Sequence, residues 1–320
     1  MTKVLIVSLD NVGDTVLSLA VRDALLKQPG YQAAFWTKDY SGEIVSLYSP
    51  AAEHYHCDPF WDKSPGQKKG KFLRFLKTLL AIRAARFDAA IILHSNWRKN
   101  LACLLAGIPL RCAANGAFAN RRLNAGQRDA HVLDTARRLT EALTGTDPGP
   151  LRCAIPVPVS GAGEQARALC DSASWAVIHP FSGNPKRNFP LASWKPVMAA
   201  LAARGLKVFV NANKVEKELF LSAAGAAVPL AFSCDGAPTL RDLAYFISRA
   251  RLFVGNNSGP LHLASALGTP CVGVYEKKDV PYIAPRGARL PLLLIYENSP
   301  EEIMPETVTA EIAKALEAGN

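Results

Sequence analysis

The sequence predicts an α/β protein made of two doubly wound domains, each built on a parallel β-sheet. Short apolar runs alternate with segments of helical periodicity in both halves of the chain, which is the pattern of βαβ units. A stretch rich in proline and glycine separates the halves at residues 144–158, and 320 residues exceed what one compact core usually supports. We therefore expect domains at 1–150 and 151–320, with ligands bound at the carboxyl ends of the strands.

In the first domain, apolar runs and helical periods predict strands and helices in alternation. The strands are expected at 3–9, 33–36 and 88–93, and the helices at 15–27, 71–86, 99–106 and 129–143. Polar, small and basic residues over 115–128 predict a loop. The helix at 71–86 is amphipathic, and we expect its Phe72 and Phe75 in the core. The apolar side of this helix carries Phe72, Phe75, Leu76, Leu79 and Leu80.

In the second domain the alternation continues to the end of the sequence. Strands are expected at 175–179, 207–211, 252–254 and 271–275. Helices are expected at 164–171, 194–203, 215–224, 240–248, 260–267 and 305–318. The last of these helices is a candidate to pack back on the first domain.

The composition excludes several classes of protein. A hydrophobic fraction of 49% and a charged fraction of 20% are those of a soluble globular protein, and no apolar run approaches the length of a membrane span. The apolar run at residues 4–7 is too short for a signal peptide and is followed by Asp10 and Asp14, so we expect a cytoplasmic protein. Seven cysteines without a CxxC pair argue against a disulfide framework or a zinc site. No His, Asp or Glu cluster has metal-ligand spacing, so we expect no metal.

The charge is uneven along the chain. The net charge is +10, and residues 60–100 hold ten basic but only two acidic side chains. Such a patch attracts phosphate-rich partners, namely nucleic acid, anionic lipid headgroups or a phosphorylated glycan. A solvated helix face is the alternative, because most runs of charge have no other role.

Two common nucleotide-binding motifs are not supported. Residues 161–166, GAGEQA, match the dinucleotide fingerprint, but they follow Pro156 and Pro158, which disfavour a central strand. No acidic residue lies about 20 positions further on, where a ribose would need it. A GxxxxGK[ST] phosphate-binding loop does not occur.

The strongest candidate site is RLFVGNNSGPLHLASALGTPCVGVY at residues 251–275. An apolar strand leads into a polar turn at residues 255–259, and Pro260 then opens a helix. Free N–H groups and the positive end of a helix dipole suit a phosphate or diphosphate. Ser258 and His262 beside the turn favour a ligand site over an ordinary βα turn.

Two further segments follow the first strand of each domain. SLDNVGDTVLSL places Asp10 and Asp14 at the start of a helix, where Asp10 is expected as a cap and Asp14, next to Gly13, as a general base. HPFSGNPKRNFP places Lys186 and Arg187 in a loop, where a cation could neutralise a diphosphate leaving group or simply be solvated. His179 in the same segment is expected to be structural.

Together these three segments resemble glycosyltransferase family 9, the heptosyltransferase family of lipopolysaccharide core assembly. LDNVGDTVLSLAVRDAL is similar to the family's opening motif and puts Asp14 at the place of its catalytic base. HPFSGNPKRNFPLASW puts Lys186 at the place of its diphosphate-binding lysine. VGNNSGPLHLASALGTPCVGVY is similar to its donor-binding motif, with Asn257 where the family has an acid.

The resemblance implies a GT-B fold, in which two Rossmann-like domains face each other across a cleft. It implies that the first domain binds the acceptor and the second the nucleotide sugar. The implied reaction is metal-independent, inverting transfer of heptose from ADP-heptose, with Asp14 as the base and no cofactor. Backbone N–H groups and Lys186 would stabilise the leaving diphosphate, and Ser258 and His262 would contact its phosphates. The implied donor-binding residues are Lys186, Asn257, Ser258, Gly259, Pro260, Leu261 and His262.

The implied acceptor is an anionic glycolipid of the Kdo–lipid A type at the cytoplasmic face of the inner membrane, which would make the protein a peripheral membrane enzyme. The acceptor-binding residues expected are Asp10, Asn11, Gly13, Lys68, Lys69, Lys71 and Arg74. One alternative is a GT-B enzyme with another nucleotide sugar or a non-lipopolysaccharide acceptor. A basic nucleic-acid-binding protein is the other, although aromatic residues interleaved with the basic ones are sparse, so we expect no nucleic acid.

Overall fold

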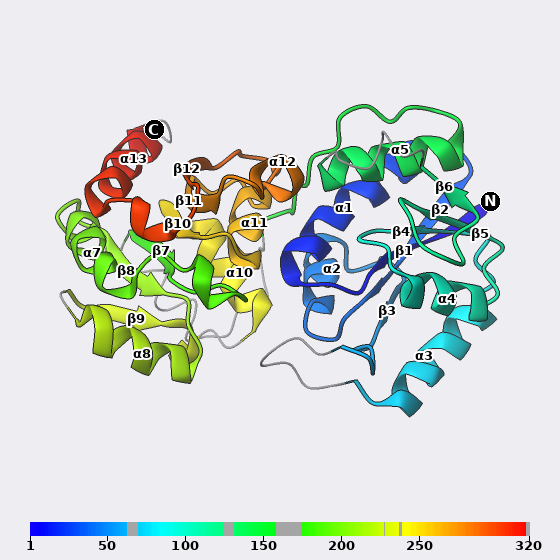
Figure 1. Cartoon of the computed structure of the whole chain (residues 1–320), viewed down its shortest axis with the longest axis horizontal. Helices are drawn as coiled ribbons and strands as arrows, with labels where there is room; N and C mark the ends of the chain where they lie inside the picture. The colour runs from blue at the N-terminus through cyan, green and yellow to red at the C-terminus, as the bar shows by residue number, and fades with distance from the viewer. Residues whose placement is uncertain (63–69, 124–130, 158–173, 227, 237–238, 318–320) are drawn as a thin grey trace. The chain divides into compact units, whose positions relative to one another are not determined.

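The computed structural model describes residues 1–62, 70–123, 131–157, 174–226, 228–236 and 239–317. By its internal contacts the chain divides into two compact units, residues 1–153 with 281–283, and residues 154–280 with 284–320. Each unit contains one six-stranded sheet (Figure 1). None of the helices in the described ranges combines the length and the apolar character needed to cross a membrane.

The sheet of the first unit is parallel, with the strand order β3-β2-β1-β4-β5-β6. Its strands are β1 (Thr2–Ser8), β2 (Tyr31–Thr37), β3 (His54–His56), β4 (Ala89–Ile92), β5 (Leu110–Ala113) and β6 (Arg121–Arg122). Its helices are α1 (Val12–Leu26), α2 (Gly42–Tyr48), α3 (Phe72–Ala84), α4 (Trp97–Leu105) and α5 (Val132–Thr144). The doubly wound parallel sheet predicted for this half of the chain is therefore confirmed.

Helices cover both faces of this sheet. Side chains alternate between the faces along β1, and Leu5 and Val7 share a core with Phe75 and Leu79 of α3 and with residues of α4. On the other face α1 contacts α2 and α5 (Figure 1). Because both faces are covered, the strands are apolar runs rather than alternating patterns.

Three short strands of this unit, namely β3, β5 and β6, were not predicted from the sequence. The strand β3 reads His-Tyr-His, and β6 has only the two residues Arg121 and Arg122, so neither contains an apolar run. The prediction of a loop over 115–128 is wrong at β6, which pairs with β5 in parallel. Backbone pairing places β3 and β6 at the two ends of the sheet, where little side-chain burial is needed.

The amphipathic helix is present as α3, but its apolar surface is wider than the core needs. Phe75, Leu79 and Ile82 are buried. The expectation that Phe72 lies in the core is wrong, because this side chain is 57% exposed. Four apolar side chains of this helix are exposed, namely Phe72, Leu73, Leu76 and Leu80.

The sheet of the second unit is also parallel, with the order β12-β11-β10-β7-β8-β9. Its strands are β7 (Trp175–His179), β8 (Lys207–Val210), β9 (Leu230–Phe232), β10 (Leu252–Asn256), β11 (Cys271–Glu276) and β12 (Leu292–Tyr296). Its α-helices are α7 (Trp194–Ala202), α8 (Lys214–Ala224), α9 (Ser233–Gly236), α10 (Leu240–Arg249), α11 (Gly259–Ala266) and α13 (Pro305–Glu317), and α12 (Val280–Ile283) follows β11. Three 3-10 turns are η2 (Pro185–Arg187), η3 (Leu191–Ser193) and η4 (Pro300–Glu302).

The second sheet is likewise covered on both faces. One core joins Ile178 and Val254 of the strands to Trp194 of α7 and to Ile312 of α13. On the other face α10 packs against α11, and the Phe246 ring of α10 stacks on Phe209 of β8 at 4.3 Å between ring centroids. The helix α13 thus belongs to the core of the second unit, and its expected packing on the first domain stays a prediction.

Some predicted features lie outside the described residues. These are the helix expected at 164–171, the segment 161–166 with its dinucleotide-like spacing, and the two acceptor candidates Lys68 and Lys69.

Candidate functional site

The carboxyl end of β10 is built around a buried asparagine. The strand extends two residues beyond its predicted end, so that Gly255 and Asn256 belong to the strand rather than to the turn. The Asn256 amide nitrogen donates to the carbonyl of Pro180 at 2.7 Å, and its oxygen accepts the Phe189 N–H at 2.9 Å. One fully buried side chain thus ties the loop after β7 to the turn after β10, two segments that the sequence assigned to the same ligand.

The turn presents only part of the backbone that the sequence suggested. Ser258 occupies the N-cap position of α11 with an extended backbone, and its hydroxyl donates to the carbonyl of Asn256 at 3.1 Å rather than capping the helix. Pro260 has no N–H group, and the N–H of Leu261 donates to the Ser258 carbonyl at 3.2 Å. Of the four residues from Ser258 to Leu261, Ser258 and Gly259 therefore keep N–H groups that can face an anion at the helix N-terminus.

Close packing fixes where this helix begins. A Cβ added at Gly273 of β11 would lie 2.6 Å from Leu261 Cδ2, and one added at Gly255 of β10 would lie 3.2 Å from the His179 carbonyl oxygen. Glycine at these two positions lets the start of α11 and the end of β7 approach the strands.

Of the two histidines of the second unit, His262 is buried and His179 is half-buried. His262 is 5% exposed, and its Nε2 lies 3.3 Å from the Tyr275 hydroxyl. The contact of His262 with phosphates implied by the resemblance stays a prediction. Burial lowers the pKa of His179 to about 4, and its Nδ1 lies 2.8 Å from the carbonyl oxygen of Asn211. The structural role expected for His179 agrees with this environment.

The two neighbouring cations of the loop have different surroundings. Arg187 Nη1 lies 2.9 Å from Asp279 Oδ2, and Arg187 Nε lies 3.5 Å from Glu276 Oε2. Lys186 is exposed, and its ammonium has no ion pair within the part of the chain that the structure describes. Lys186 is therefore the cation available to an incoming anion, whereas Arg187 holds the loop against one carboxylate at the end of β11 and one just after it.

Asn257 belongs to the same network. Its amide nitrogen donates to Asp279 Oδ2 at 2.9 Å, the same carboxylate that Arg187 contacts. A carboxylate thus lies beside the position where the resembling family has an acid, although it comes from a residue 22 positions later. Asp279 and Asn257 together offer both acceptor and donor groups to sugar hydroxyls.

In the first unit, Asp14 lies at the carboxyl edge of the sheet, in the first turn of α1. Its Oδ2 accepts the N–H of Asn11 at 3.0 Å, and its Oδ1 lies 2.9 Å from Nε2 of His94. Asn11 in turn accepts a hydrogen bond from the Tyr40 hydroxyl at 3.1 Å. His94 follows β4, the neighbour of β1, with a left-handed backbone at φ 44°. The doubly wound order of strands therefore brings the carboxylate and the imidazole together.

A buried ion pair lies beside this pair. Lys99 Nζ is 2.5 Å from Asp10 Oδ2 and also donates to the carbonyl of His94 at 3.0 Å. The Lys99 side chain is buried, so it is part of the site and not of the basic surface to which the sequence assigned it. Burial opposes a charge on His94, but the hydrogen bond and charge of Asp14, with the charge of Asp10, outweigh it and raise the pKa of the imidazole.

The structure brings together only some of the predicted acceptor residues. Asp10, Asn11 and Gly13 surround Asp14 at the start of α1, with Gly13 buried in its first turn. Lys71 caps α3 and is exposed. Arg74 Nη2 lies 2.6 Å from Asp39 Oδ1, so part of its charge is already neutralised.

Sequence reasoning left out several residues of these sites. His94 could have been found, because it follows a predicted strand at the edge where ligands bind. Asn256 and Asp279 could not, since their partners are distant in sequence and the bonds depend on which loops fold side by side. The burial of Lys99 could not be predicted either, because a run of basic residues does not indicate that one of them is buried.

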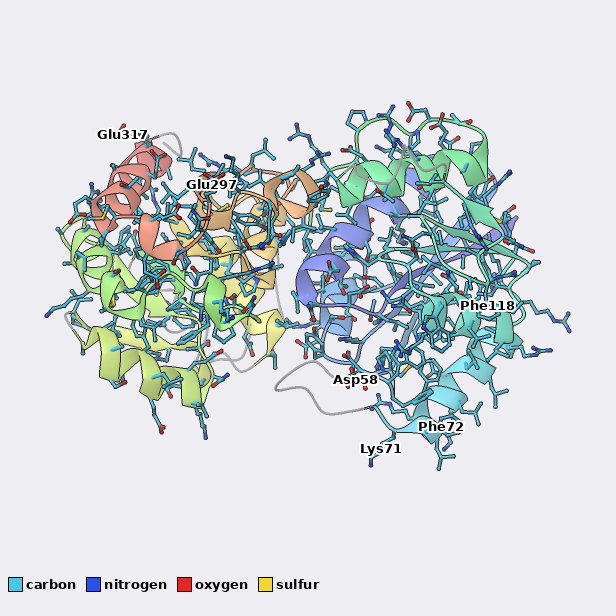
Figure 2. All side chains as sticks on the ribbon, viewed as in Figure 1. Asp58, Lys71, Phe72, Phe118, Glu297 and Glu317 are labelled. Atoms are coloured by element: carbon cyan, nitrogen blue, oxygen red, sulfur yellow. The ribbon has the colours of Figure 1, made fainter. Side chains whose placement is uncertain are left out.

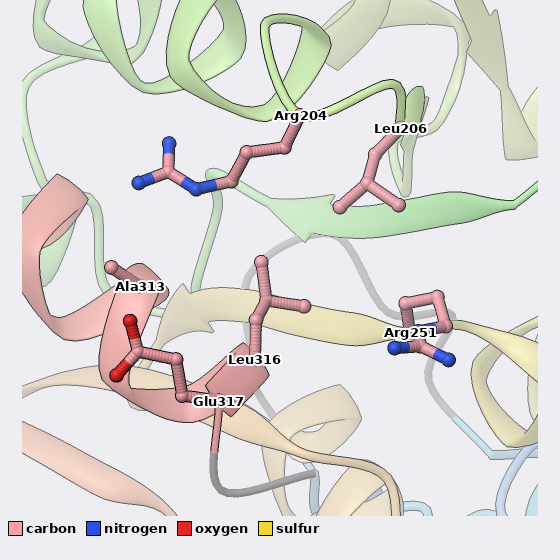
Figure 3. Close-up of a pocket in the computed structure, with 6 residues that line it drawn as sticks. All are labelled: Arg204, Leu206, Arg251, Ala313, Leu316 and Glu317. Atoms are coloured by element: carbon pink, nitrogen blue, oxygen red, sulfur yellow. The ribbon is translucent and has the colours of Figure 1, made fainter. Parts of the chain in front are cut away.

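A pocket of about 280 Å³ in the second unit lies at the other edge of its sheet (Figure 3). Arg204 and Leu206 precede β8 and Arg251 precedes β10, while α13 supplies the remaining wall. These are the amino ends of the strands, whereas doubly wound folds bind ligands at the carboxyl ends. The pocket is therefore not a candidate for the nucleotide.

Comparisons with known proteins bear on both units. A family model described as glycosyltransferase family 9 (heptosyltransferase) matches residues 75–310. A putative glycosyltransferase of Haemophilus influenzae is 24% identical over 298 residues, which cover 86% of this chain and 82% of that protein. The structure of E. coli ADP-heptose lps heptosyltransferase II has a TM-score of 0.73 at 19% identity, over 99% of both chains. E. coli heptosyltransferase WaaC with ADP has a TM-score of 0.78 at 18% identity, over 98% of this chain and 100% of the other.

At these identities the solved structures establish the fold, which is the GT-B fold of two Rossmann-like units. The family model spans most of the chain, including the greater part of α3, the loop that carries Lys186 and the turn before α11. The chain therefore belongs to glycosyltransferase family 9, the heptosyltransferase family, and is a glycosyltransferase.

Proposed function

We propose that this enzyme transfers heptose from ADP-heptose to a lipopolysaccharide inner-core acceptor of the Kdo–lipid A type, with inversion and without a metal. Family membership supports the transfer of a heptose, and a similar structure named as an ADP-heptose lps heptosyltransferase supports this donor and acceptor class. The observation that carries the proposal is the pairing of Asp14 with His94 at the sheet edge of the first unit.

In the proposed reaction, Asp14 takes the proton of the acceptor hydroxyl. The hydroxyl oxygen forms a bond to the anomeric carbon from the face opposite the diphosphate, the carbon–oxygen bond to ADP breaks, and ADP leaves with the electron pair. This single displacement inverts the anomeric centre. The N–H of Asn11 and the imidazole of His94 fix the direction of the carboxylate, and the ion pair of Asp10 with Lys99 lies beside it.

The second unit is proposed to bind the donor and stabilise the leaving group. Lys186 and the N–H groups of Ser258 and Gly259 would face the diphosphate, where negative charge develops as ADP leaves. These groups would take the role that a divalent cation has in other transferases, so we propose that no metal is required. A chelator should therefore leave the rate of transfer unchanged.

The acceptor is proposed to bind to the first unit. Asp10, Asn11 and Gly13 lie next to Asp14 at the start of α1, and exposed Lys71 lies at the start of α3. With Arg74, Lys68 and Lys69, Lys71 supplies positive charge for a phosphorylated, Kdo-bearing glycolipid. Such an acceptor would place the enzyme on the cytoplasmic face of the inner membrane as a peripheral protein.

Replacement of Asp14 by Asn tests the proposed reaction. The variant keeps the size of the side chain but cannot accept the proton, so transfer from ADP-heptose should fall by about 10²–10⁴-fold. Its affinity for ADP, measured by calorimetry, should stay unchanged. Transfer at nearly the wild-type rate would exclude Asp14 as the base.

Replacement of Lys186 by Ala tests the donor site separately. The affinity for ADP should fall by about tenfold or more, because a charge-assisted hydrogen bond to phosphate is lost. Lys195→Ala, also exposed in the second unit, is the matched control and should bind ADP normally. An unchanged affinity in Lys186→Ala would remove its assigned role.

A transferase with another nucleotide sugar is the second candidate function, and the contact of Asn257 with Asp279 favours it. An amide at this position changes the hydrogen-bonding pattern offered to the sugar, while Asp279 keeps a carboxylate nearby. A thermal-shift screen against ADP-, GDP- and UDP-sugars separates the two candidates, since the ligand with the highest affinity raises the apparent stability most. Selective stabilisation by a donor other than ADP-heptose would decide for the alternative.

A further inference from the structure

The helices α3 and α4 of the first unit present an exposed apolar surface that the proposed reaction does not use. A groove of about 310 Å³ lies between them. Its walls include Phe60, Phe72, Leu76, Trp97 and Leu105, and each of these side chains is exposed. Figure 1 shows the two helices side by side, and Figure 2 shows Phe72 and Lys71 at the start of α3. Exposed apolar surface gathered in this way marks an interaction site more often than a solvated face.

Packed aromatic rings support one end of the groove. The Phe60 ring packs edge to face on Phe72 at 5.2 Å and on Trp61 at 4.9 Å between ring centroids. Phe75, which is buried, contacts both Phe60 and Trp61 and anchors the cluster to the core of the unit. The exposed rings are thus held by packing instead of lying loosely on the surface.

The segment that carries both helices of the groove is basic, and Arg98 lines the groove itself. Over residues 70–107 the chain has seven basic side chains and one acidic side chain, Asp88. Asp88 accepts the backbone N–H of Lys3. Of the basic residues, Lys99 is buried against Asp10 and Arg74 is paired with Asp39. The Arg98 guanidinium lies over the exposed Trp97 ring, 4.8 Å from its centroid. Apolar side chains with cations around them match an anionic amphiphile, in which acyl chains lie next to negatively charged headgroups.

From this charge and burial pattern we infer that the α3–α4 face docks on an anionic lipid bilayer. Phe72, Leu76, Leu80 and Trp97 enter the boundary between headgroups and acyl chains, and Lys71 and Lys77 contact the headgroup phosphates. A second copy of the chain fits less well, because pairing two such faces would bring like charges together. A nucleic acid would use the cations but not the apolar groove. The inference rests on the proposed glycolipid acceptor for its role in the cell, but lipid binding itself requires neither donor nor transfer.

Co-sedimentation of the whole protein with vesicles tests the inference in the absence of ADP-heptose. Wild type should bind vesicles of phosphatidylcholine and phosphatidylglycerol, and bind vesicles of phosphatidylcholine alone far more weakly. The double variant Phe72→Ser, Leu80→Ser changes side chains that are 57% and 56% exposed, so the fold should be retained. Its partitioning to anionic vesicles should fall by about tenfold or more, since two apolar side chains no longer enter the bilayer.

Matched controls come from α8 of the second unit. The variant Val215→Ser, Leu219→Ser removes side chains that are 66% and 52% exposed and should bind vesicles like wild type. Lys71→Gln with Lys77→Gln should weaken binding by about fivefold for each charge removed. Lys195→Gln with Lys214→Gln, both exposed in the second unit, should have little effect. Thermal midpoints and ADP affinity of all variants verify that the fold is intact.

Several results would overturn the inference. One is equal loss of vesicle binding in the α3 and α8 serine variants, and another is the absence of wild-type binding to anionic vesicles. If the lysine variant of α3 lost vesicle binding but the serine variant did not, attraction would come from charge alone. That result would exclude insertion of the apolar side chains into the bilayer. Concentration-dependent dimers that disappear in Phe72→Ser, Leu80→Ser without lipid would assign the face to a second copy. If vesicle binding holds while Asp14→Asn transfers heptose normally, the proposed base fails and the lipid surface stands.

Discussion

At the scale of single residues, the pair of Asp14 and His94 gives the protein a pH signature. The pKa of His94 is raised in the folded state, so the protonated imidazole stabilises the fold. This contribution is fully present below the ordinary pKa of about 6.5 and is lost as the pH rises through the raised value. His94→Gln removes the titration. Wild type should therefore exceed the variant in stability by about 1 kcal/mol at low pH and by less at higher pH, measured by urea unfolding.

If the stability difference between wild type and His94→Gln grew as the pH rose, the raised pKa of His94 would be wrong.

Asn256 and Asn257 are neighbours whose replacement should lower the unfolding free energy by different amounts. Asn256→Ala leaves the Pro180 carbonyl and the Phe189 N–H buried without their partner, which should cost about 2–4 kcal/mol of unfolding free energy. Asn257→Ala loses a bond to Asp279 at a half-buried position and should cost less than about 1 kcal/mol. Denaturant unfolding measures both values. Equal losses would show that Asn256 does not tie the loop to the strand.

At the scale of elements, the position of α11 depends on the glycine beneath it. In Gly273→Ala the added methyl would approach the buried Leu261 of α11 to 2.6 Å, so the helix must shift or the core must be strained. Overpacking of this kind costs about 1–3 kcal/mol. Because the same shift moves the N–H groups of Ser258 and Gly259, the affinity for ADP should fall together with stability, as measured by calorimetry.

Gly183→Ala is the matched control for this prediction. Nothing lies within 4 Å of a Cβ built at Gly183, although this residue belongs to the loop that carries Lys186. The control should keep both stability and ADP affinity. A Gly273→Ala variant that lost stability but bound ADP normally would separate the packing of α11 from the donor site.

The elements also show how much the sequence could predict. The runs that became β1, β4, β7 and β11 are apolar over most of their length, because buried parallel strands need apolar side chains on both faces. The apolar run of β12 was nevertheless missed. The short strands β3, β6 and β9 lie at sheet edges and each pairs with one neighbour, so their own side chains carry little signal. For α3, periodicity predicted the helix but not which apolar residues face the core, and Phe72 was assigned wrongly.

The residues of the candidate sites likewise fall into those that the sequence could predict and those that it could not. Asp14, Lys186 and Ser258 follow the strands or begin the helices of recognisable βα turns, so the fold class alone predicts that they lie at the carboxyl edge of a sheet. His94, Asp279 and Asn256 act through partners 22 to 80 positions away, and only the folded chain brings them within hydrogen-bond distance.

At the scale of the whole molecule, the net positive charge is larger in the first half of the sequence. Residues 1–150 carry 20 basic and 13 acidic side chains, whereas residues 151–320 carry 17 and 14. If the first unit receives a polyanionic glycolipid and the second a nucleotide sugar, binding of the acceptor should depend more on long-range attraction. Binding of the donor should depend more on short contacts with Lys186 and backbone N–H groups, which salt screens less.

The expected outcome is a different salt dependence of the two substrates in the same enzyme. The screening length falls from about 10 Å at 0.1 M salt to about 3 Å at 1 M. Raising sodium chloride across this range should lower kcat/KM for the phosphorylated glycolipid by about tenfold or more, and kcat/KM for ADP-heptose by only about twofold. Detergent-dispersed acceptor at constant micelle concentration avoids effects on vesicles, and sucrose at matched osmolality controls for water activity. An equal decline for both substrates would mean that the charge of residues 1–150 does not select the acceptor, and a steeper decline for the donor would reverse the proposed assignment of the two units.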